Sequence, residues 1–198
     1  DDTLAGLGKL AAAARQRVGA GIVAVTGSVG KTGTKEALKA VLAEQGITHA
    51  SGGSLNNQWG VPLSLARMPA DAAFGVFEIG MNHAGEITPL VRLVRPHVAV
   101  ITTVEAVHLE YFDSIRAIAD AKAEIFLGLE PGGMAVLNRD NSCFAQLAER
   151  AATAGVKNIL TFGSHAEADV RLIKHALHAS CSCITADICG QAMAYKIG

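Results

Sequence analysis

The hydrophobic and polar positions of this chain alternate between two spacings along most of its length. Short apolar runs predict strands at 22–25, 47–50, 73–79, 97–103, 134–137 and 158–162. Apolar residues at helical spacing predict helices at 3–18, with Thr3 as the cap, and at 35–44, 62–68, 85–95, 114–129 and 142–153. Because the strands are apolar on both faces and alternate with helices, the pattern predicts an α/β fold, a mostly parallel sheet with helices on both faces.

The carboxy-terminal part departs from this alternation. From Asp169 onward, three strand-like segments follow one another without helices, at 170–178, 181–188 and 192–197. Turns near Ala179 and Gly190 separate them. The pattern therefore predicts a small antiparallel β meander added to the α/β body.

One junction between a strand and a helix carries a phosphate-binding pattern. A helix follows the strand 22–25 after the loop Thr26-Gly27-Ser28-Val29-Gly30-Lys31-Thr32-Gly33. The two bracketing glycines allow the backbone N–H groups to face one anion, and the helix adds its free N–H groups and the positive end of its dipole. The lysine would reach the outer phosphates and the threonine hydroxyl would bind magnesium. We predict a P-loop at residues 27–33, although Val25 stands where the general pattern has a glycine.

Length, composition and charge narrow the classes of function. The chain has 198 residues, 50% of them apolar and 18% charged, which is typical of a globular protein with its own core. A net charge of −1 provides no basic face for nucleic acid or anionic lipid. No apolar run approaches the ~20 residues of a membrane span. We therefore expect a small-molecule substrate, no nucleic acid partner, no membrane insertion and a cytoplasmic location.

Polar residues after the predicted strands are candidates for a site around the P-loop, because ligands of doubly wound sheets gather beyond the carboxyl ends of the strands. Glu78 ends the buried run 74–77 and is suited to holding magnesium; the alternative is a solvated or capping acid. His108 follows the strand 97–103. A loop histidine taken alone is more often structural or exposed than catalytic.

Other polar residues leave two interpretations open. Lys122 lies on an otherwise apolar helix, where a lysine with its ammonium in water is the ordinary interpretation. Asn56, Asn57, Asn82 and His83 lie in glycine-flanked loops, where ligand binding and simple turn chemistry are about equally common.

Five motifs, in the same order, resemble the central ATPase domain of the Mur ligase family. They are Thr26-Gly-Ser-Val-Gly-Lys-Thr32, Leu55-Asn-Asn-Gln-Trp-Gly-Val-Pro62, Glu78-Ile-Gly-Met-Asn-His-Ala-Gly-Glu-Ile87, His108-Leu-Glu110 and Ala121-Lys-Ala-Glu-Ile-Phe126. The resemblance runs from about Leu4 to the end of the chain. The second and third motifs most resemble the member that adds D-alanyl-D-alanine to UDP-N-acetylmuramoyl-tripeptide. The resemblance implies an ADP-forming amide ligase that acts through an acyl phosphate in peptidoglycan precursor synthesis, in the bacterial cytoplasm.

The resemblance also implies roles for the candidates around the P-loop. Residues 27–33 would bind ATP, with Lys31 on its phosphates. Thr32 and Glu78 would hold one Mg²⁺ ion.

For the remaining candidates the resemblance implies a second Mg²⁺ ion and a substrate contact. His108 and Lys122 would serve the second ion, with Lys122 carbamylated so that a cation becomes a carboxylate. Together with the P-loop lysine they would be the catalytic residues. The residues near the substrate would be Asn57, Asn82 and His83.

Mur ligases have three domains, so the resemblance implies neighbours for this chain. An amino-terminal domain grips the UDP-sugar, and a carboxy-terminal domain brings the amino-acid substrate and closes over ATP. We expect residues 1–20 to be a linker helix from a missing N-terminal domain. Residues 21–198 would be the central domain, incomplete at its C-terminal end, with the C-terminal ligase domain absent. Such a fragment would fold, bind magnesium nucleotide weakly at best, and not ligate.

Two alternatives remain open from the sequence. Another ligase of the superfamily, such as a folylpolyglutamate synthase or a different Mur enzyme, would share the P-loop, and the element Asn-Asn-x-x-Gly-Val-Pro argues against it. A non-catalytic nucleotide-binding module belongs to another class, and it would have no need of His108 and Lys122.

Overall fold

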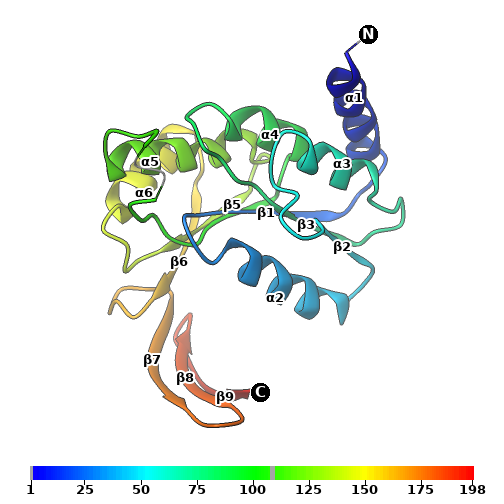
Figure 1. Ribbon diagram of the computed structural model, residues 1–198. Helices are drawn as coiled ribbons and strands as arrows, with labels where there is room; N and C mark the ends of the chain where they lie inside the picture. Colours follow the sequence, from blue (N-terminus) through cyan, green and yellow to red (C-terminus); the bar gives the residue numbers. More distant parts are fainter. Residues whose placement is uncertain (1, 108–109) are drawn as a thin grey trace.

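The computed structural model describes residues 2–107 and 110–198, and it has the expected α/β order (Figure 1). Its helices are α1 (Thr3–Gln16), α2 (Lys31–Ala43), α3 (Gly60–Ala66), α4 (Ile87–Val94), α5 (Ile115–Ala123), the 3₁₀ helix η1 (Glu124–Gly128) and α6 (Phe144–Thr153). Its strands are β1 (Gly21–Thr26), β2 (Thr48–Ala50), β3 (Phe74–Glu78), β4 (Val98–Ile101), β5 (Met134–Asn138), β6 (Asn158–Gly163), β7 (Val170–Leu177), β8 (Ser182–Ile188) and β9 (Gln191–Ile197). Within the described part of the chain, no helix is both long and apolar enough to cross a membrane.

The strands form one sheet in the order β2-β3-β1-β4-β5-β6-β7-β8-β9. The strands from β2 to β7 in this order pair in parallel. Val23 of β1, for example, lies opposite Val76 of β3 on one side and Val98 of β4 on the other. The carboxyl ends of β1, β3 and β4 therefore meet at one edge of the sheet, which is where a ligand is expected.

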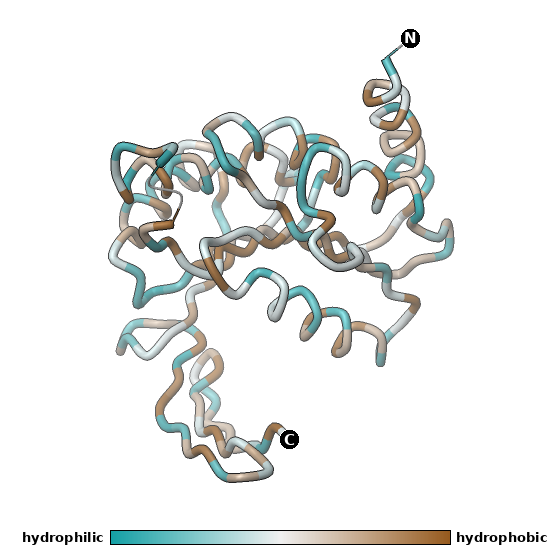
Figure 2. Tube along the Cα trace, in the orientation of Figure 1, coloured by the Kyte–Doolittle hydropathy of each residue, from teal (hydrophilic) through white to brown (hydrophobic). Residues whose placement is uncertain are grey.

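Helices cover both faces of this sheet, but unequally. Figure 1 shows α2 on one face and α3 to α6 on the other. Successive strand residues point to opposite faces, so Ala24 belongs to the large core under α3 to α6, whereas Val25 packs toward Leu38 and Leu42 of α2. Figure 2 shows the apolar segments concentrated along the central strands. Helices on both faces explain why these strands are nearly continuously hydrophobic in sequence.

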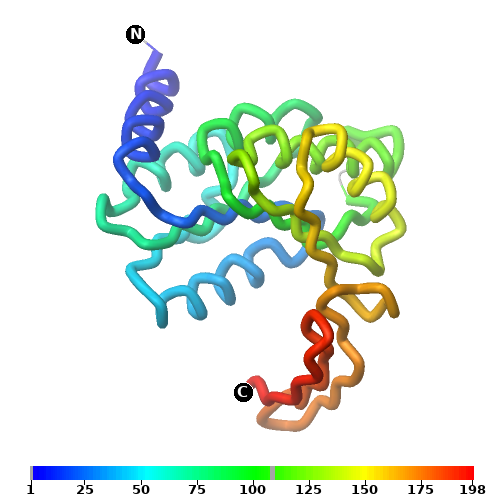
Figure 3. The backbone as a smooth tube through the Cα atoms, turned by 180° about the vertical axis from the view of Figure 1, so that it is seen from behind, coloured from blue at the N-terminus to red at the C-terminus, as the bar shows by residue number. Residues whose placement is uncertain are grey.

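The antiparallel meander predicted at the carboxy terminus is confirmed, and it continues the main sheet. Two parallel residue pairs, Phe162–Val170 and Gly163–Arg171, join β6 to β7. Antiparallel pairing then joins β7 to β8 and β8 to β9. Seen from both sides, these strands extend away from the helical body, at the end opposite α1 (Figures 1 and 3).

The predicted cap of the first helix is wrong. Asp2, and not Thr3, caps α1, because the Asp2 carboxylate accepts hydrogen bonds from the N–H groups of Leu4 (3.0 Å) and Ala5 (3.1 Å). A carboxylate satisfies these otherwise unpaired donors and also favours the positive end of the helix dipole. The helix ends at Gln16 and not at 18.

Other helix boundaries also differ from the prediction. The helix expected at 35–44 begins earlier, at Lys31, because Gly30 adopts the left-handed conformation (φ 84°) and turns the chain directly from loop into helix. The helix expected at 114–129 is α-helical only to Ala123 and then tightens into η1. The ends of α3 and α4 shift by one or two residues.

A buried arginine joins α1 to the body. Arg15 is 6% exposed, and its guanidinium donates to the carbonyls of Val94 (2.8 Å), Arg95 (2.9 Å) and Val18 (3.3 Å). The first two carbonyls lie at the carboxyl end of α4, where a helix has acceptors without intrahelical partners and where a cation is favourable. Arg15, a residue of α1, therefore caps the carboxyl end of α4.

Replacement of Arg15 by methionine should destabilise the chain by about 2–4 kcal/mol, because buried carbonyls lose their donor at roughly 1–3 kcal/mol each. Urea unfolding followed by circular dichroism would show a lower midpoint. The matched control is Arg17→Met: Arg17 is exposed and donates to the Met68 carbonyl (2.9 Å), so we expect a change below about 1 kcal/mol. Equal losses in the two variants would contradict the capping role.

Candidate active site

The P-loop connects β1 to α2 and requires glycine at both of its ends. At Gly27, with φ of 151°, a Cβ atom would overlap the hydroxyl of Thr102 on the neighbouring strand end. Gly30 takes the left-handed conformation at the N-cap of α2 and has no side chain with which to cap the helix. The N-terminal amides of α2 are therefore left for an external acceptor such as a phosphate.

The segment after β4 holds the P-loop in place. The Thr102 hydroxyl donates to the carbonyl of Val29 (2.6 Å), and the Ser28 amide donates to the carbonyl of Thr103 (2.9 Å). The Ser28 hydroxyl also accepts the N–H of Glu105 (2.9 Å). A loop tied at successive residues keeps its shape before a ligand arrives, which lowers the entropy cost of binding.

The ammonium of Lys31 lies over the loop that precedes it. It donates to the carbonyls of Gly27 (2.7 Å) and Ser28 (3.3 Å). Burial lowers the pKa of Lys31, and the nearby Glu78 carboxylate opposes that shift. The Lys31 ammonium thus lies beside the backbone amides that would bind phosphate. The Glu78 carboxylate is close enough to stabilise its positive charge.

The carboxylate of Glu78 has a donor on each oxygen. Glu78 ends β3 and is 2% exposed. The Thr32 hydroxyl donates to its Oε2 (2.8 Å), and the Asn56 side-chain amide donates to its Oε1 (2.7 Å). The structure therefore brings together Thr32 and Glu78, the two residues expected to hold magnesium. A hydroxyl and a carboxylate oxygen side by side are ligands of the kind that Mg²⁺ prefers.

Lys122 is buried beside the P-loop lysine. It lies on α5 and is 3% exposed, so the interpretation as a solvated lysine is wrong. Burial, and then repulsion by the Lys31 ammonium, lower the pKa of Lys122 to about 7. Near neutral pH a large share of this side chain is a neutral amine, which is nucleophilic. His108, the other residue expected at a second metal ion, lies outside the described residues.

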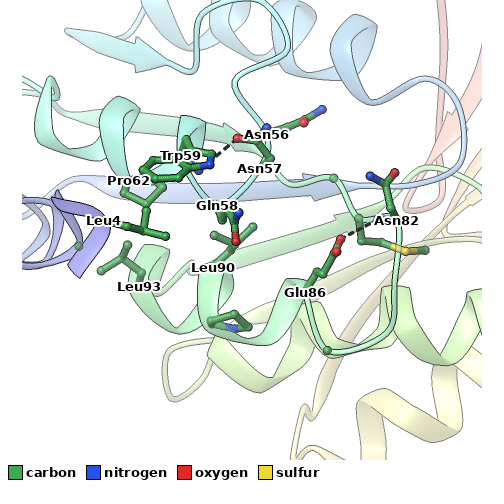
Figure 4. Close-up of a pocket in the computed structure, with 15 residues that line it drawn as sticks. Leu4, Asn56, Asn57, Gln58, Trp59, Pro62, Asn82, Glu86, Leu90 and Leu93 are labelled. Atoms are coloured by element: carbon green, nitrogen blue, oxygen red, sulfur yellow. Dashed lines mark hydrogen bonds between the residues drawn. The ribbon is translucent and has the colours of Figure 1, made fainter. Parts of the chain in front are cut away.

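Two of the predicted substrate residues line one cavity of about 740 Å³, Asn57 and Asn82. Figure 4 shows Trp59, Pro62, Leu4 and Leu93 along one side of it, with Asn82 and Glu86 on the other. The cavity is thus apolar along one wall and hydrogen-bonding along the other. Such a combination suits a ligand that is itself partly polar.

The three residues predicted near the substrate are also held by local hydrogen bonds. The side-chain oxygen of Asn57 accepts the Gly60 amide (2.9 Å) at the start of α3. The Asn82 amide donates to Glu86 (2.7 Å), and the His83 ring contacts the same carboxylate (3.1 Å) and lies 4.6 Å from the Tyr111 ring. His83 is not among the residues that line the cavity.

Sequence reasoning missed two charged residues near the site. Lys35 is completely buried on α2, and its ammonium donates to the carbonyls of Ser51 and Gly53. Glu124 follows Lys122 closely, and its carboxylate accepts the amide of Gly85 (2.6 Å). Lys35 could have been recognised by its position one helical turn after Lys31, on the same helix. Nothing in the sequence marks Glu124 apart from its place in the motif 121–126.

Comparison with known proteins agrees with this geometry. The family model described as Mur ligase middle domain matches residues 25–197. The UDP-N-acetylmuramoyl-tripeptide–D-alanyl-D-alanine ligase of Rickettsia prowazekii is 41% identical over 167 residues, which make up 84% of this chain and 37% of the relative. The chain therefore spans little more than a third of the length of this curated relative.

Solved structures have the same fold over the whole chain. A crystal structure of MurF from Acinetobacter baumannii matches with a TM-score of 0.92 and 31% identity, covering 100% of this chain and 43% of that one. MurF from Thermotoga maritima in complex with ADP matches with a TM-score of 0.89 and 26% identity, covering 99% and 44%. With its P-loop, its sheet order and a family match over most of its length, the chain belongs to the Mur ligase middle domain family.

Proposed function

We propose that this chain is the ATP-binding middle domain of a UDP-N-acetylmuramoyl-tripeptide–D-alanyl-D-alanine ligase, an ATP-dependent, ADP-forming amide ligase. The observation that carries the proposal is the 2.8 Å contact between the Thr32 hydroxyl and the Glu78 carboxylate, next to Lys31 of the P-loop. A P-loop nucleotide site needs this oxygen pair for its magnesium ion. The relative from R. prowazekii has this ligase name, and the MurF of T. maritima is described in complex with ADP.

In this proposal the backbone of residues 27–33 binds the ATP phosphates. The amides of the first turn of α2 and the positive end of its dipole face the anion. The Lys31 ammonium exchanges the loop carbonyls for phosphate oxygens, and a charged acceptor makes the stronger hydrogen bond.

Thr32 and Glu78 fit magnesium by the chemistry of their oxygen atoms. The Asn56 amide donates to the other Glu78 oxygen and orients the carboxylate, so Thr32 and Glu78 Oε2 would be the oxygen atoms available to hold the ion. Magnesium bound there would neutralise charge on the transferring phosphate group.

Lys122 and His108 would serve a second magnesium ion. The nitrogen of a neutral Lys122 amine can attack the carbon of carbon dioxide: a C–N bond forms, one C=O π bond opens, and the nitrogen loses a proton to water. The product is a carbamate, whose two oxygens make the side chain an anionic ligand. The burial of Lys122 and its pKa near neutrality support this step, since only the neutral amine is nucleophilic. A module that only binds nucleotide gains nothing from a buried lysine beside a second one, so this residue favours an enzyme.

The chemistry we propose has two steps. A carboxylate oxygen of the tripeptide attacks the γ-phosphorus of ATP, and the bond from that phosphorus to ADP breaks. The amine of D-alanyl-D-alanine then attacks the carbonyl carbon of the acyl phosphate, loses a proton, and phosphate leaves. In both steps negative charge develops beside Lys31, whose ammonium is already in place to balance it.

The tripeptide end of the acceptor would enter the cavity lined by Asn57 and Asn82, with His83 on the adjoining loop. Residues 1–20 would link an amino-terminal domain that holds the UDP-sugar, and residues 21–198 would be the middle domain. A carboxy-terminal domain would bring D-alanyl-D-alanine. The specificity for the third peptide residue would then belong to those neighbouring domains.

Replacement of Lys31 by methionine should weaken binding of magnesium ATP at least about tenfold, or ~1.4 kcal/mol, because a phosphate loses its cationic partner. Isothermal titration calorimetry on this chain measures the effect. Lys9→Met, an exposed lysine of α1, is the control and should bind as the unchanged chain does. Equal affinity of the chain and its Lys31 variant would speak against the assigned P-loop.

A carbamate on Lys122 should appear by ¹³C NMR after addition of ¹³C-bicarbonate. Because the pKa of Lys122 is about 7, the neutral amine and the carbamate signal should increase as the pH rises from about 6 to 8, where ordinary lysines stay protonated. The signal should be absent in Lys122→Met and unchanged in Lys39→Met. A signal that survives in Lys122→Met would assign the carbamate elsewhere and overturn this role.

A further inference from the structure

Lys35 has its charge completely inside the protein. Its side chain is 0% exposed, and the ammonium donates to the carbonyls of Ser51 (2.8 Å) and Gly53 (3.0 Å) and pairs with the Glu36 carboxylate (3.0 Å). An ammonium has three donors, and these contacts use all three. A buried cation is costly unless it is satisfied in this way, so the contacts explain how Lys35 is tolerated but not what it contributes.

The segment that Lys35 holds leads directly to Glu78. The Ser51 hydroxyl accepts the Glu78 amide (3.2 Å), and Asn56 donates from its side chain to the Glu78 carboxylate (2.7 Å). The Asn56 carbonyl also accepts the amide of Gly80 (2.8 Å). Residues 51–56 therefore wrap the end of β3 and orient its acid.

The middle of this segment has few other means of attachment, in contrast to Ser51 and Asn56 at its ends. Residues 52–54 are Gly-Gly-Ser and are exposed, so no large apolar side chain packs them against the core. Glycines also have the largest conformational freedom to lose on ordering. The two hydrogen bonds from Lys35 therefore tie Gly53, inside this glycine-rich stretch, and Ser51, directly before it, to α2.

We propose that Lys35 is a positioning residue for the Glu78 carboxylate. In this role Lys35, one helical turn after Lys31 of the P-loop, increases the affinity of the site for magnesium. Thr32 and Lys35 lie on the same helix: Thr32 reaches Glu78 directly, and Lys35 reaches it through residues 51–56. One helix thereby fixes both the hydroxyl and the carboxylate that would hold the ion. This inference rests on the proposed function, because it takes Glu78 as the magnesium ligand.

The test compares Lys35→Met with Lys39→Met in the full-length protein. Methionine keeps the unbranched stem of lysine and removes the ammonium. Lys39 lies on the same helix, is 51% exposed and is 3.9 Å from the same Glu36 carboxylate, so it is a matched control. In Lys35→Met the Mg²⁺ concentration for half-maximal ADP formation should rise about tenfold or more, as for other residues that orient a metal ligand. The kcat at saturating Mg²⁺ should stay within about threefold, and Lys39→Met should match the wild type.

A binding measurement gives a readout without turnover. Mn²⁺ titration in the presence of ADP, followed by electron paramagnetic resonance, should show weaker Mn²⁺ binding in Lys35→Met by a similar factor. Asn56→Ala should show the same shift, and the double variant should be no worse than the single ones within about twofold, because the two residues act through one path.

A folded Lys35→Met protein with an unchanged half-saturating Mg²⁺ concentration would overturn the proposal. A lower Tm or kcat in that protein would not rescue it, because a loss of stability alone can lower both. Should Lys35→Met not fold, Lys35→Gln replaces it. The glutamine amide has two donors for the three acceptors of Lys35, on a side chain one bond shorter, so it holds the loop less well. A smaller shift is therefore expected, and no shift overturns the proposal. Wild-type protein that makes no ADP with both peptide substrates contradicts the proposed function instead, and the Mn²⁺ titration still decides the role of Lys35.

Discussion

The site depends on one carboxylate, that of Glu78, at the end of a buried strand. A charge at that depth is stable only if it is satisfied, and each oxygen has its own donor: Thr32 from the P-loop helix and Asn56 from the loop after β2. Two segments that are far apart in sequence therefore each donate a hydrogen bond to this one carboxylate. The parallel order β2-β3-β1 makes this possible, because it sets both segments at the same edge of the sheet.

Positive charge gathers around this acid, but not all of it is compensated. Lys35 pairs with Glu36, and the Glu78 carboxylate favours the charged form of Lys31, whereas burial and the Lys31 ammonium lower the pKa of Lys122. Because Lys122 is partly a neutral amine near pH 7, the positive charge beside the P-loop is chiefly that of Lys31. An anionic group at the P-loop amides would therefore have its cationic partner in Lys31.

Much of the fold could be predicted from the sequence, because strand burial and helix amphipathicity leave local signals. The P-loop was recognisable because only glycine tolerates the backbone at Gly27 and Gly30. Arg15 and Lys35 were missed for the opposite reason: their partners are carbonyls of distant segments, at Val94 and Ser51, and no local pattern reports them. A role for Lys122 in the site was expected only through the family resemblance, and its burial was not predicted, since an isolated lysine on an apolar helix is ordinarily solvated.

The cavity and the phosphate site share a common scaffold. Asn56 faces Glu78, while its neighbour Asn57 caps the start of α3 on the cavity side. The Glu124 carboxylate accepts the amide of Gly85, which lies in the same loop as Asn82. Because Glu124 directly follows α5, this hydrogen bond connects that loop to the helix that contains Lys122. A transfer reaction needs its reacting atoms held at about 3–3.5 Å. Hydrogen bonds from adjacent residues tie the cavity side and the phosphate side of the site to one framework, which favours such fixed positions.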